Sequence, residues 1–166
     1  MKLVVADSGP LIVLARSGLL EVLRQVAGEV LVPATVFAEC TGDVRKPGAH
    51  AILVARDAGL LSVHADVAAT ALGNIAALDA GELAALALAL HLKQPVLMDE
   101  RLGRQVAALH QIAVVGSAGV LLMAKRRGLI AAVGPVLASW QAMGYFLAPA
   151  LLQAVLARAG ESAGSV

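Results

Sequence analysis

Acidic residues stand directly after two apolar runs of the sequence. Asp7 follows residues 3–6, and Asp99 and Glu100 follow residues 96–98. Short apolar runs of this kind predict buried strands, and open parallel sheets bind ligands at the carboxyl ends of their strands. An acid at such a junction can also cap the following helix, so a ligand-binding role and a capping role both stay open.

Two further acids lie on predicted helices. Glu39 is set in an otherwise apolar turn, residues 36–40, where the alternative to a site is a solvated helix face. Glu82 follows Asp79 by three residues, which is the spacing of a capping box. The helix that Glu82 opens is apolar on all sides as far as His91, which predicts burial and places Glu82 close to the sheet.

Such a set of acids favours a cation site. Clustered carboxylates repel one another unless a cation neutralises them, and hard oxygen ligands suit Mg²⁺ or Mn²⁺. The four histidines are scattered along the chain, which argues against zinc. Cys40 is interpreted as a small buried hydrophobic residue.

Serines and arginines near these acids could meet a substrate. Ser8 and Ser117 follow predicted strands and could donate hydrogen bonds to a ligand, with helix capping as the alternative. Arg101 and Arg104 lie one helical turn apart beyond Asp99 and could contact backbone phosphates. The sequence holds no nucleophile elbow and no glycine-rich nucleotide loop, which disfavours a serine hydrolase and classical nucleotide binding.

Composition limits the class of protein. The chain has 166 residues, which suits one domain, and 59% of them are hydrophobic. Its net charge of +1 gives no bulk attraction to nucleic acid, and 2% aromatic residues exclude base-stacking platforms. A single cysteine excludes a disulfide framework, and the first apolar run is too short for a signal peptide, so we expect a cytoplasmic protein. The uncharged stretch 128–157 is interrupted by glycine, proline and polar residues and predicts two short buried helices rather than a membrane span.

The elements that must position these residues alternate along the chain. Buried strands are predicted at 3–6, 29–32, 60–63, 96–98 and 112–115, with helices between them. Ser8 or Gly9 is expected to cap the first helix, with Pro10 at its first position. This alternation predicts an α/β fold, a mostly parallel sheet with helices on both faces. We expect one domain over residues 1–158 and a flexible tail over 159–166.

Five stretches of the sequence together resemble the PIN-domain family, within its largely uncharacterised toxin-ribonuclease-related group. Their order and spacing carry the resemblance, which extends over most of the chain. The stretches are residues 4–12, 32–39, 78–89, 96–104 and 115–122.

The resemblance implies a three-layer PIN-like fold and a metal-dependent ribonuclease that hydrolyses RNA phosphodiester bonds. In this interpretation Asp7, Glu39, Glu82 and Asp99 are catalytic and hold Mg²⁺ or Mn²⁺, with either Asp99 or Glu100 as the fourth ligand. The resemblance also implies a role as the toxin of a toxin–antitoxin pair, an antitoxin protein as partner, and a homodimer. The alternative is a catalytically weak or inactive PIN-like module that binds nucleic acid.

Overall fold

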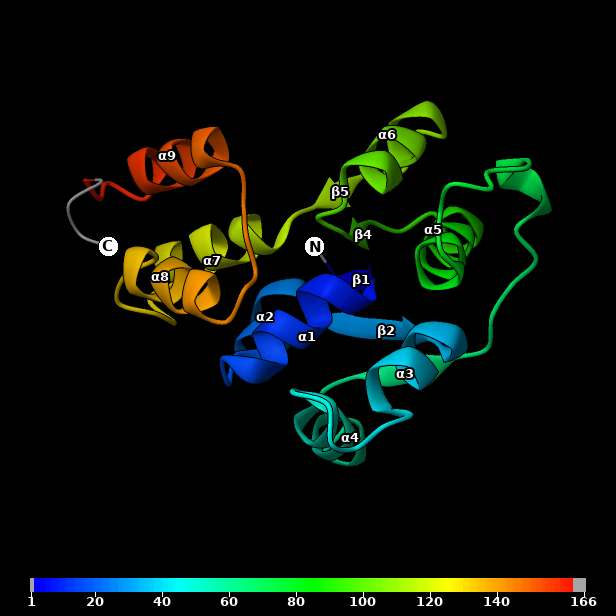
Figure 1. Cartoon of the computed structure of the whole chain (residues 1–166), viewed down its shortest axis with the longest axis horizontal. Helices are drawn as coiled ribbons and strands as arrows, with labels where there is room; N and C mark the ends of the chain where they lie inside the picture. The colour runs from blue at the N-terminus through cyan, green and yellow to red at the C-terminus, as the bar shows by residue number, and fades with distance from the viewer. Residues whose placement is uncertain (1, 163–166) are drawn as a thin grey trace. The chain divides into compact units, whose positions relative to one another are not determined.

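The computed structural model describes residues 2–162. These residues group into two compact units that divide after Ser117. The first unit holds the sheet and the predicted acids, and the second is helical (Figure 1).

Five parallel strands form the sheet of the first unit, in the order β3-β2-β1-β4-β5. Val5 of the central strand pairs with Leu31 on one side and with Val96 on the other. All three residues of β1 from Val4 to Ala6 are at most 1% exposed, as expected for a strand covered on both faces. The strands are β1 (Leu3–Ala6), β2 (Glu29–Pro33), β3 (Ser62–His64), β4 (Val96–Leu97) and β5 (Val114–Val115).

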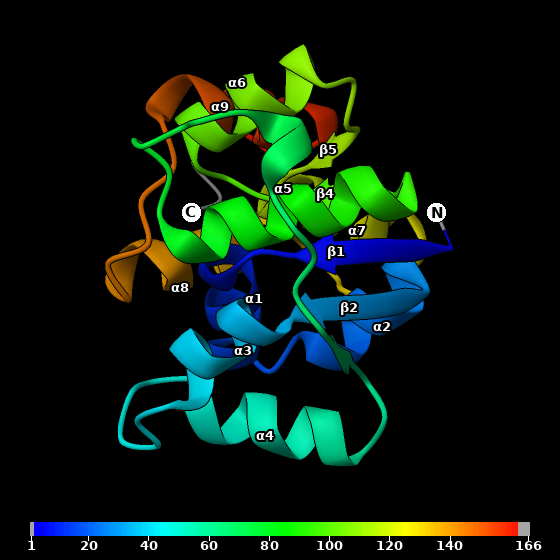
Figure 2. The same ribbon diagram turned by 90° about the vertical axis from the view of Figure 1, so that its right-hand side faces the viewer.

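Helices of the first unit cover both faces of this sheet. Parallel crossovers are right-handed, so the helices that lead from β1 to β3 and those that lead back to β4 and β5 lie on opposite faces. Figure 2 shows α5 beside β1 and β4, both of which it contacts. The helices are α1 (Ser8–Arg16), α2 (Leu20–Ala27), α3 (Ala34–Thr41), α4 (Ala49–Asp57), α5 (Ala80–Leu92) and α6 (Arg101–Leu109), with a short 3-10 helix, η1, at Thr70–Leu72.

This architecture confirms the predicted three-layer α/β fold, while some element ends differ. Pro10 is the third residue of α1 rather than the first, because the helix already begins at Ser8. Proline is tolerated throughout a first turn, where the N–H groups need no helical partner. The strands predicted from residues 60 and 112 start later, because the Leu60 and Ile112 N–H groups close the preceding helices on the Ala55 and Ala107 carbonyls (both 2.8 Å).

The second unit consists of helices. The uncharged stretch 128–157 forms two separate short helices, as predicted, and no helix within residues 2–162 is long and apolar enough to cross a membrane. The helices are α7 (Ser117–Arg126), which begins at the last residue of the first unit, α8 (Gly134–Ala142) and α9 (Pro149–Arg158).

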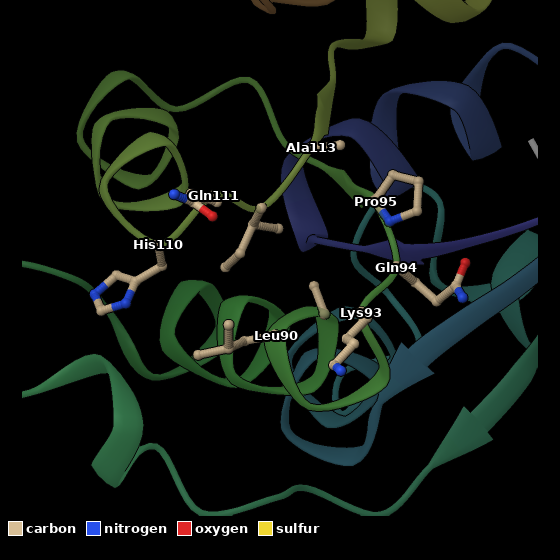
Figure 3. A pocket seen from close by; sticks show the side chains of 9 residues that line it. Leu90, Lys93, Gln94, Pro95, His110, Gln111 and Ala113 are labelled. Carbon is tan, nitrogen blue, oxygen red and sulfur yellow. The ribbon is translucent and has the colours of Figure 1, made fainter.

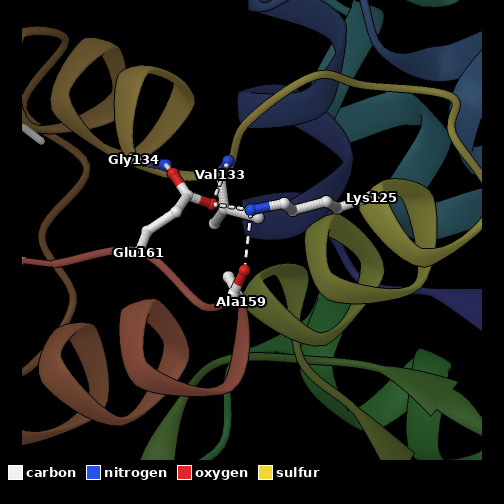
Figure 4. A network of polar contacts seen from close by, with 5 residues as sticks. All are labelled: Lys125, Val133, Gly134, Ala159 and Glu161. Atoms are coloured by element: carbon white, nitrogen blue, oxygen red, sulfur yellow. Dashed lines mark hydrogen bonds and ion pairs between the residues drawn. The ribbon is translucent and has the colours of Figure 1, made fainter.

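A polar network ties the end of the described chain to this second unit (Figure 4). The Glu161 carboxylate accepts hydrogen bonds from the N–H groups of Val133 and Gly134 at the start of α8, both at 2.9 Å. Lys125 donates to Glu161 (2.8 Å) and to the Ala159 carbonyl (2.7 Å). Of the predicted tail, residues 163–166 lie outside the described residues, whereas Ala159 and Glu161 take part in this network.

Candidate active site

Asp7 is the buried acid at the end of the central strand. Its N–H donates to the Leu97 carbonyl of β4 at 3.0 Å. Later strands are added on both sides of β1, so its carboxyl end is the switch point at which such sheets bind ligands. The Asp7 side chain forms no capping hydrogen bond to α1. A side-chain cap of α1 therefore does not account for the presence of an aspartate at this position.

The environment of Asp7 disfavours its charged form. The residue is 4% exposed, and its Oδ1 has no hydrogen-bond partner among the described residues. Burial raises the pKa of Asp7 to about 7, with further increases from the charges of Glu82, Asp79 and Glu39, while the Ser8 N–H acts in the opposite direction. A buried acid that faces three other carboxylates is electrostatically unfavourable unless a proton or a cation accompanies it.

Glu39 reaches this region from α3, which packs against α5. Its carboxylate lies against Gly81 in the first turn of α5: a Cβ at position 81 would overlap Oε2 and lie 3.1 Å from Oε1. Partial burial and the charge of Asp79 raise the pKa of Glu39, and the Gly81 N–H lowers it. Although Glu39 as a whole is exposed, its charged end is therefore docked at the start of α5.

Glu82 and Asp79 form the predicted capping box. The Glu82 N–H donates to Asp79 Oδ1 (2.8 Å), and the Asp79 N–H donates to Glu82 Oε2 (3.0 Å). Burial raises the pKa of Glu82, as do the charges of Asp79 and Glu100. The capping role of Glu82 is confirmed, and the charge of the same residue also raises the pKa of Asp7.

Asp99 follows β4, as predicted, and is held by Ser117. Its Oδ1 accepts from the Ser117 N–H (2.8 Å) and its Oδ2 from the Ser117 hydroxyl (2.5 Å). Ser117 is fully buried. Its hydroxyl donates to Asp99, and the substrate contact predicted for this serine stays a prediction.

Glu100 and the two arginines surround the start of α6. Glu100 is the N-cap residue and accepts from the Leu102 N–H (2.7 Å), so its capping role is also observed. Arg101 and Arg104 are exposed. The Arg104 guanidinium lies near Gly116, where Asp99 also lies: a Cβ at position 116 would be 3.5 Å from Nη1 of Arg104 and 3.1 Å from Oδ1 of Asp99. Ser8, half-buried, begins α1 directly beside Asp7.

The donor set suits a hard divalent cation. The carboxylates of Glu39 and Glu82 lie close enough to Asp7 to act on its charge, and the unpartnered Oδ1 of Asp7 gives a cation a buried oxygen to bind. Within residues 2–162, however, no three acidic, histidine or cysteine side chains already converge at metal-binding distance. Glu39 and Glu82 each accept a hydrogen bond from a backbone N–H at the start of α5.

Asp79 is an acid of this region that the sequence pattern marks only as a helix cap. In the structure its charge acts on Asp7, Glu39 and Glu82. The sequence contains a sign of this role in the spacing of Asp79 and Glu82, because a capping box brings its two acids into one helical turn.

A cavity of about 410 Å³ lies at the amino ends of β4 and β5, whereas the acids follow the carboxyl ends of the strands (Figure 3). It is lined by residues that directly precede β4 and β5, Pro95 and Ala113, and by Lys93 and His110 at the ends of α5 and α6. None of its lining residues carries a carboxylate. The cavity is therefore separate from the acidic site and has no ligands for a hard cation.

Comparison with known families agrees with this geometry. A family model described as a PIN domain matches residues 3–161, a span that includes every acid described above. Comparison with curated proteins and with solved structures found no match. The parallel sheet between helix layers fits a PIN-like fold. The chain therefore belongs to the PIN-domain family, whose members are generally nucleases of the hydrolase class.

Proposed function

We propose that this PIN domain is a metal-dependent ribonuclease that hydrolyses phosphodiester bonds of RNA. One observation carries the proposal: Asp7, buried at the switch point of the sheet, has an unpartnered Oδ1 and lies near the carboxylates of Glu39 and Glu82. This arrangement is stable as a set of charged groups only with a cation, and Mg²⁺ or Mn²⁺ fits oxygen ligands of this kind.

In this proposal Asp7, Glu39 and Glu82 hold the cation, with Asp99 or Glu100 as a fourth ligand. A bound cation would supply an activated water and neutralise charge on the phosphate. Asp99 keeps its orientation through Ser117, and Glu100 stands one residue further on, at the start of α6. Arg101 and Arg104, exposed on α6, would contact phosphates of the RNA backbone, and Ser8 would donate to substrate.

Two measurements test the proposal. Isothermal titration calorimetry with Mn²⁺ should detect binding by the unmodified chain and its loss in Asp7→Asn. A cleavage assay on a fluorescent RNA should show turnover that requires Mg²⁺ or Mn²⁺ and disappears in Asp7→Asn purified in the same way. Equal cleavage by both proteins, or cleavage that persists in excess chelator, would refute the assignment.

A catalytically inactive PIN-like module is the second candidate. It is favoured by the engagement of Glu39, Glu82 and Asp99 with other groups of the protein. This candidate predicts RNA binding without cleavage at saturating Mn²⁺. A toxin role, an antitoxin partner and a homodimer stay predictions from the family resemblance.

A further inference from the structure

We propose that Asp79 is a positioning residue of this site: it orients Glu82 through the first turn of α5 and adds a negative charge that strengthens cation binding beside Asp7. The inference rests on the proposed function, because it concerns the same cation.

The first argument is the geometry of the capping box. The Asp79 carboxylate accepts from the Glu82 N–H and so fixes the first turn of α5, from which the Glu82 side chain extends. Glu82 Oε2 accepts from the Asp79 N–H, which leaves Oε1 outside the capping box. The Asp79 side chain thus acts on Glu82 through the backbone turn that it caps, and it does not itself need to touch the cation.

The second argument is that three acids share one helix terminus. Asp79 accepts from the Glu82 N–H, while the Glu39 carboxylate lies against Gly81. The N-terminus of a helix carries partial positive charge, which reduces the repulsion between these carboxylates. The first turn of α5 therefore brings the carboxylates of Glu39 and Glu82 together.

An independent observation points to a ligand at this place. Asp7 is 4% exposed, and its Oδ1 has no partner among the described residues. Asp79 caps the same helical turn against which the Glu39 carboxylate lies, so its charge stands at the start of α5 beside two of the proposed ligands. A cation bound to Asp7 would experience the same charge as an attraction.

Asp79 could instead be only a cap, and two variants separate these roles. Asp79→Asn keeps an oxygen that can accept from the Glu82 N–H and removes the charge, since asparagine caps helices about as well as aspartate. Asp79→Ala removes both the charge and the cap. Asp57→Asn is the matched control, because Asp57 is exposed at the end of α4 beside Arg56 and also loses one negative charge.

The experiment measures Mn²⁺ affinity by calorimetry and thermal unfolding of the metal-free proteins. Asp79→Asn should weaken Mn²⁺ binding by roughly 10- to 100-fold, with an unchanged or higher midpoint of unfolding. Asp79→Ala should weaken binding and also lower the midpoint, whereas Asp57→Asn should leave Mn²⁺ affinity unchanged.

Three results would overturn the inference or separate it from the proposed function. Unchanged Mn²⁺ affinity in Asp79→Asn would show that Asp79 is only a cap. An equal loss of affinity in Asp57→Asn would show a non-specific charge effect and would also overturn the inference. Absence of Mn²⁺ binding by the unmodified chain would refute the metal site and the role of Asp79 together, whereas Mn²⁺ binding without RNA cleavage would refute only the nuclease and leave the role of Asp79 supported.

Discussion

The carboxylate of Asp99 accepts hydrogen bonds from both the N–H and the hydroxyl of Ser117. The same arrangement occurs on the other side of the central strand β1, between β2 and β3, where Asp66 accepts from the N–H and the hydroxyl of Thr35. In each case an acid that follows one strand holds the start of the helix that follows the neighbouring strand. These contacts join elements at the carboxyl edge of the sheet, where the candidate site lies.

Removal of the Ser117 hydroxyl tests the first of these contacts. Ser117→Ala should lower the free energy of unfolding by about 1–3 kcal/mol, because the variant cannot form the buried hydrogen bond to the carboxylate. Urea unfolding followed by circular dichroism measures this change. Ser62→Ala, at an exposed position of β3, is the control and should differ little from the unmodified chain. Equal stability of Ser117→Ala and the control would contradict the contact.

Neutralisation of Asp7 should stabilise the metal-free protein. The pKa of Asp7 is about 7 in the folded chain and near 3.8 in the unfolded chain, so unfolding releases a proton between these values. Stability of the unmodified chain should therefore fall as pH rises from about 4 to 7 and change little from this source above 7. Asp7→Asn has no carboxyl group to titrate at this position and should not lose stability in this way. At pH 8 its free energy of unfolding should be higher than that of the unmodified chain by about 2–4 kcal/mol.

Thermal unfolding in chelator from pH 4 to 9 measures this difference. The gap between the two proteins should close toward pH 4, where Asp7 is protonated in the folded chain and about half protonated in the unfolded chain. Addition of Mn²⁺ at pH 8 should raise the unfolding midpoint of the unmodified chain alone. A gap that does not vary with pH would contradict the environment described for Asp7.

Gly81→Ala tests the docking of Glu39 on α5. A Cβ at position 81 would displace the flexible carboxylate end of Glu39, while alanine favours the helix by about 1 kcal/mol relative to glycine. We expect weaker Mn²⁺ binding without loss of stability. In a Glu39→Ala background the same substitution should have no further effect on Mn²⁺ affinity, because the displaced group is already absent. Equal losses in both backgrounds would show that position 81 acts in another way.

The Lys125–Glu161 pair should control the acid stability of the second unit. Hydrogen bonds from Lys125 and from the Val133 and Gly134 N–H groups lower the pKa of Glu161 to about 2. This stabilisation is present above about pH 4.5, the ordinary range of a glutamate, and disappears as pH falls toward 2. Lys125→Met should shift acid unfolding of this unit to higher pH.

Tryptophan fluorescence measures this shift selectively. The chain contains one tryptophan, Trp140 on α8, which packs edge-on against Tyr145 with 5.9 Å between ring centroids. An acid transition of Lys125→Met identical to that of the unmodified chain would show that the network does not hold the unit together.

Charge reversal on α6 tests the predicted phosphate contacts. In the Asp7→Asn background, which should not cleave RNA, Arg101→Glu with Arg104→Glu should weaken RNA binding. The slope of log K against log salt should become shallower by about 0.7 for each phosphate that the variant no longer binds. Arg45→Glu with Lys46→Glu changes the same charge on an exposed loop and is the matched control. Similar losses of affinity in both double variants would indicate general electrostatics rather than a binding surface on α6.

Local patterns predict much of this fold. Apolar runs locate all five strands, and the capping box at Asp79 marks the start of α5. The predicted starts of β3 and β5 are wrong, because Leu60 and Ile112 are apolar like strand residues but complete the ends of helices. Hydrophobicity does not distinguish these two uses.

The partners of each acid are less predictable. The sequence predicts that Asp7 and Glu82 lie near the same end of the sheet, but the pairing of Asp99 with Ser117 depends on β4 and β5 being neighbours. Strand order is set by packing of the whole chain, and no local spacing encodes it. The nearness of Asp79 to Asp7 depends in the same way on how α5 crosses the sheet.

The central position of β1 has a consequence for synthesis on the ribosome. Val5 finds its first neighbour at Leu31, but its other neighbour, Val96, emerges much later. Until then β1 lacks β4 as its second neighbour, and the first turn of α5, which begins at Ala80, is made only shortly before. A chain translated only as far as β3 therefore cannot assemble the acidic site, because Glu82 and Asp99 have not yet been made.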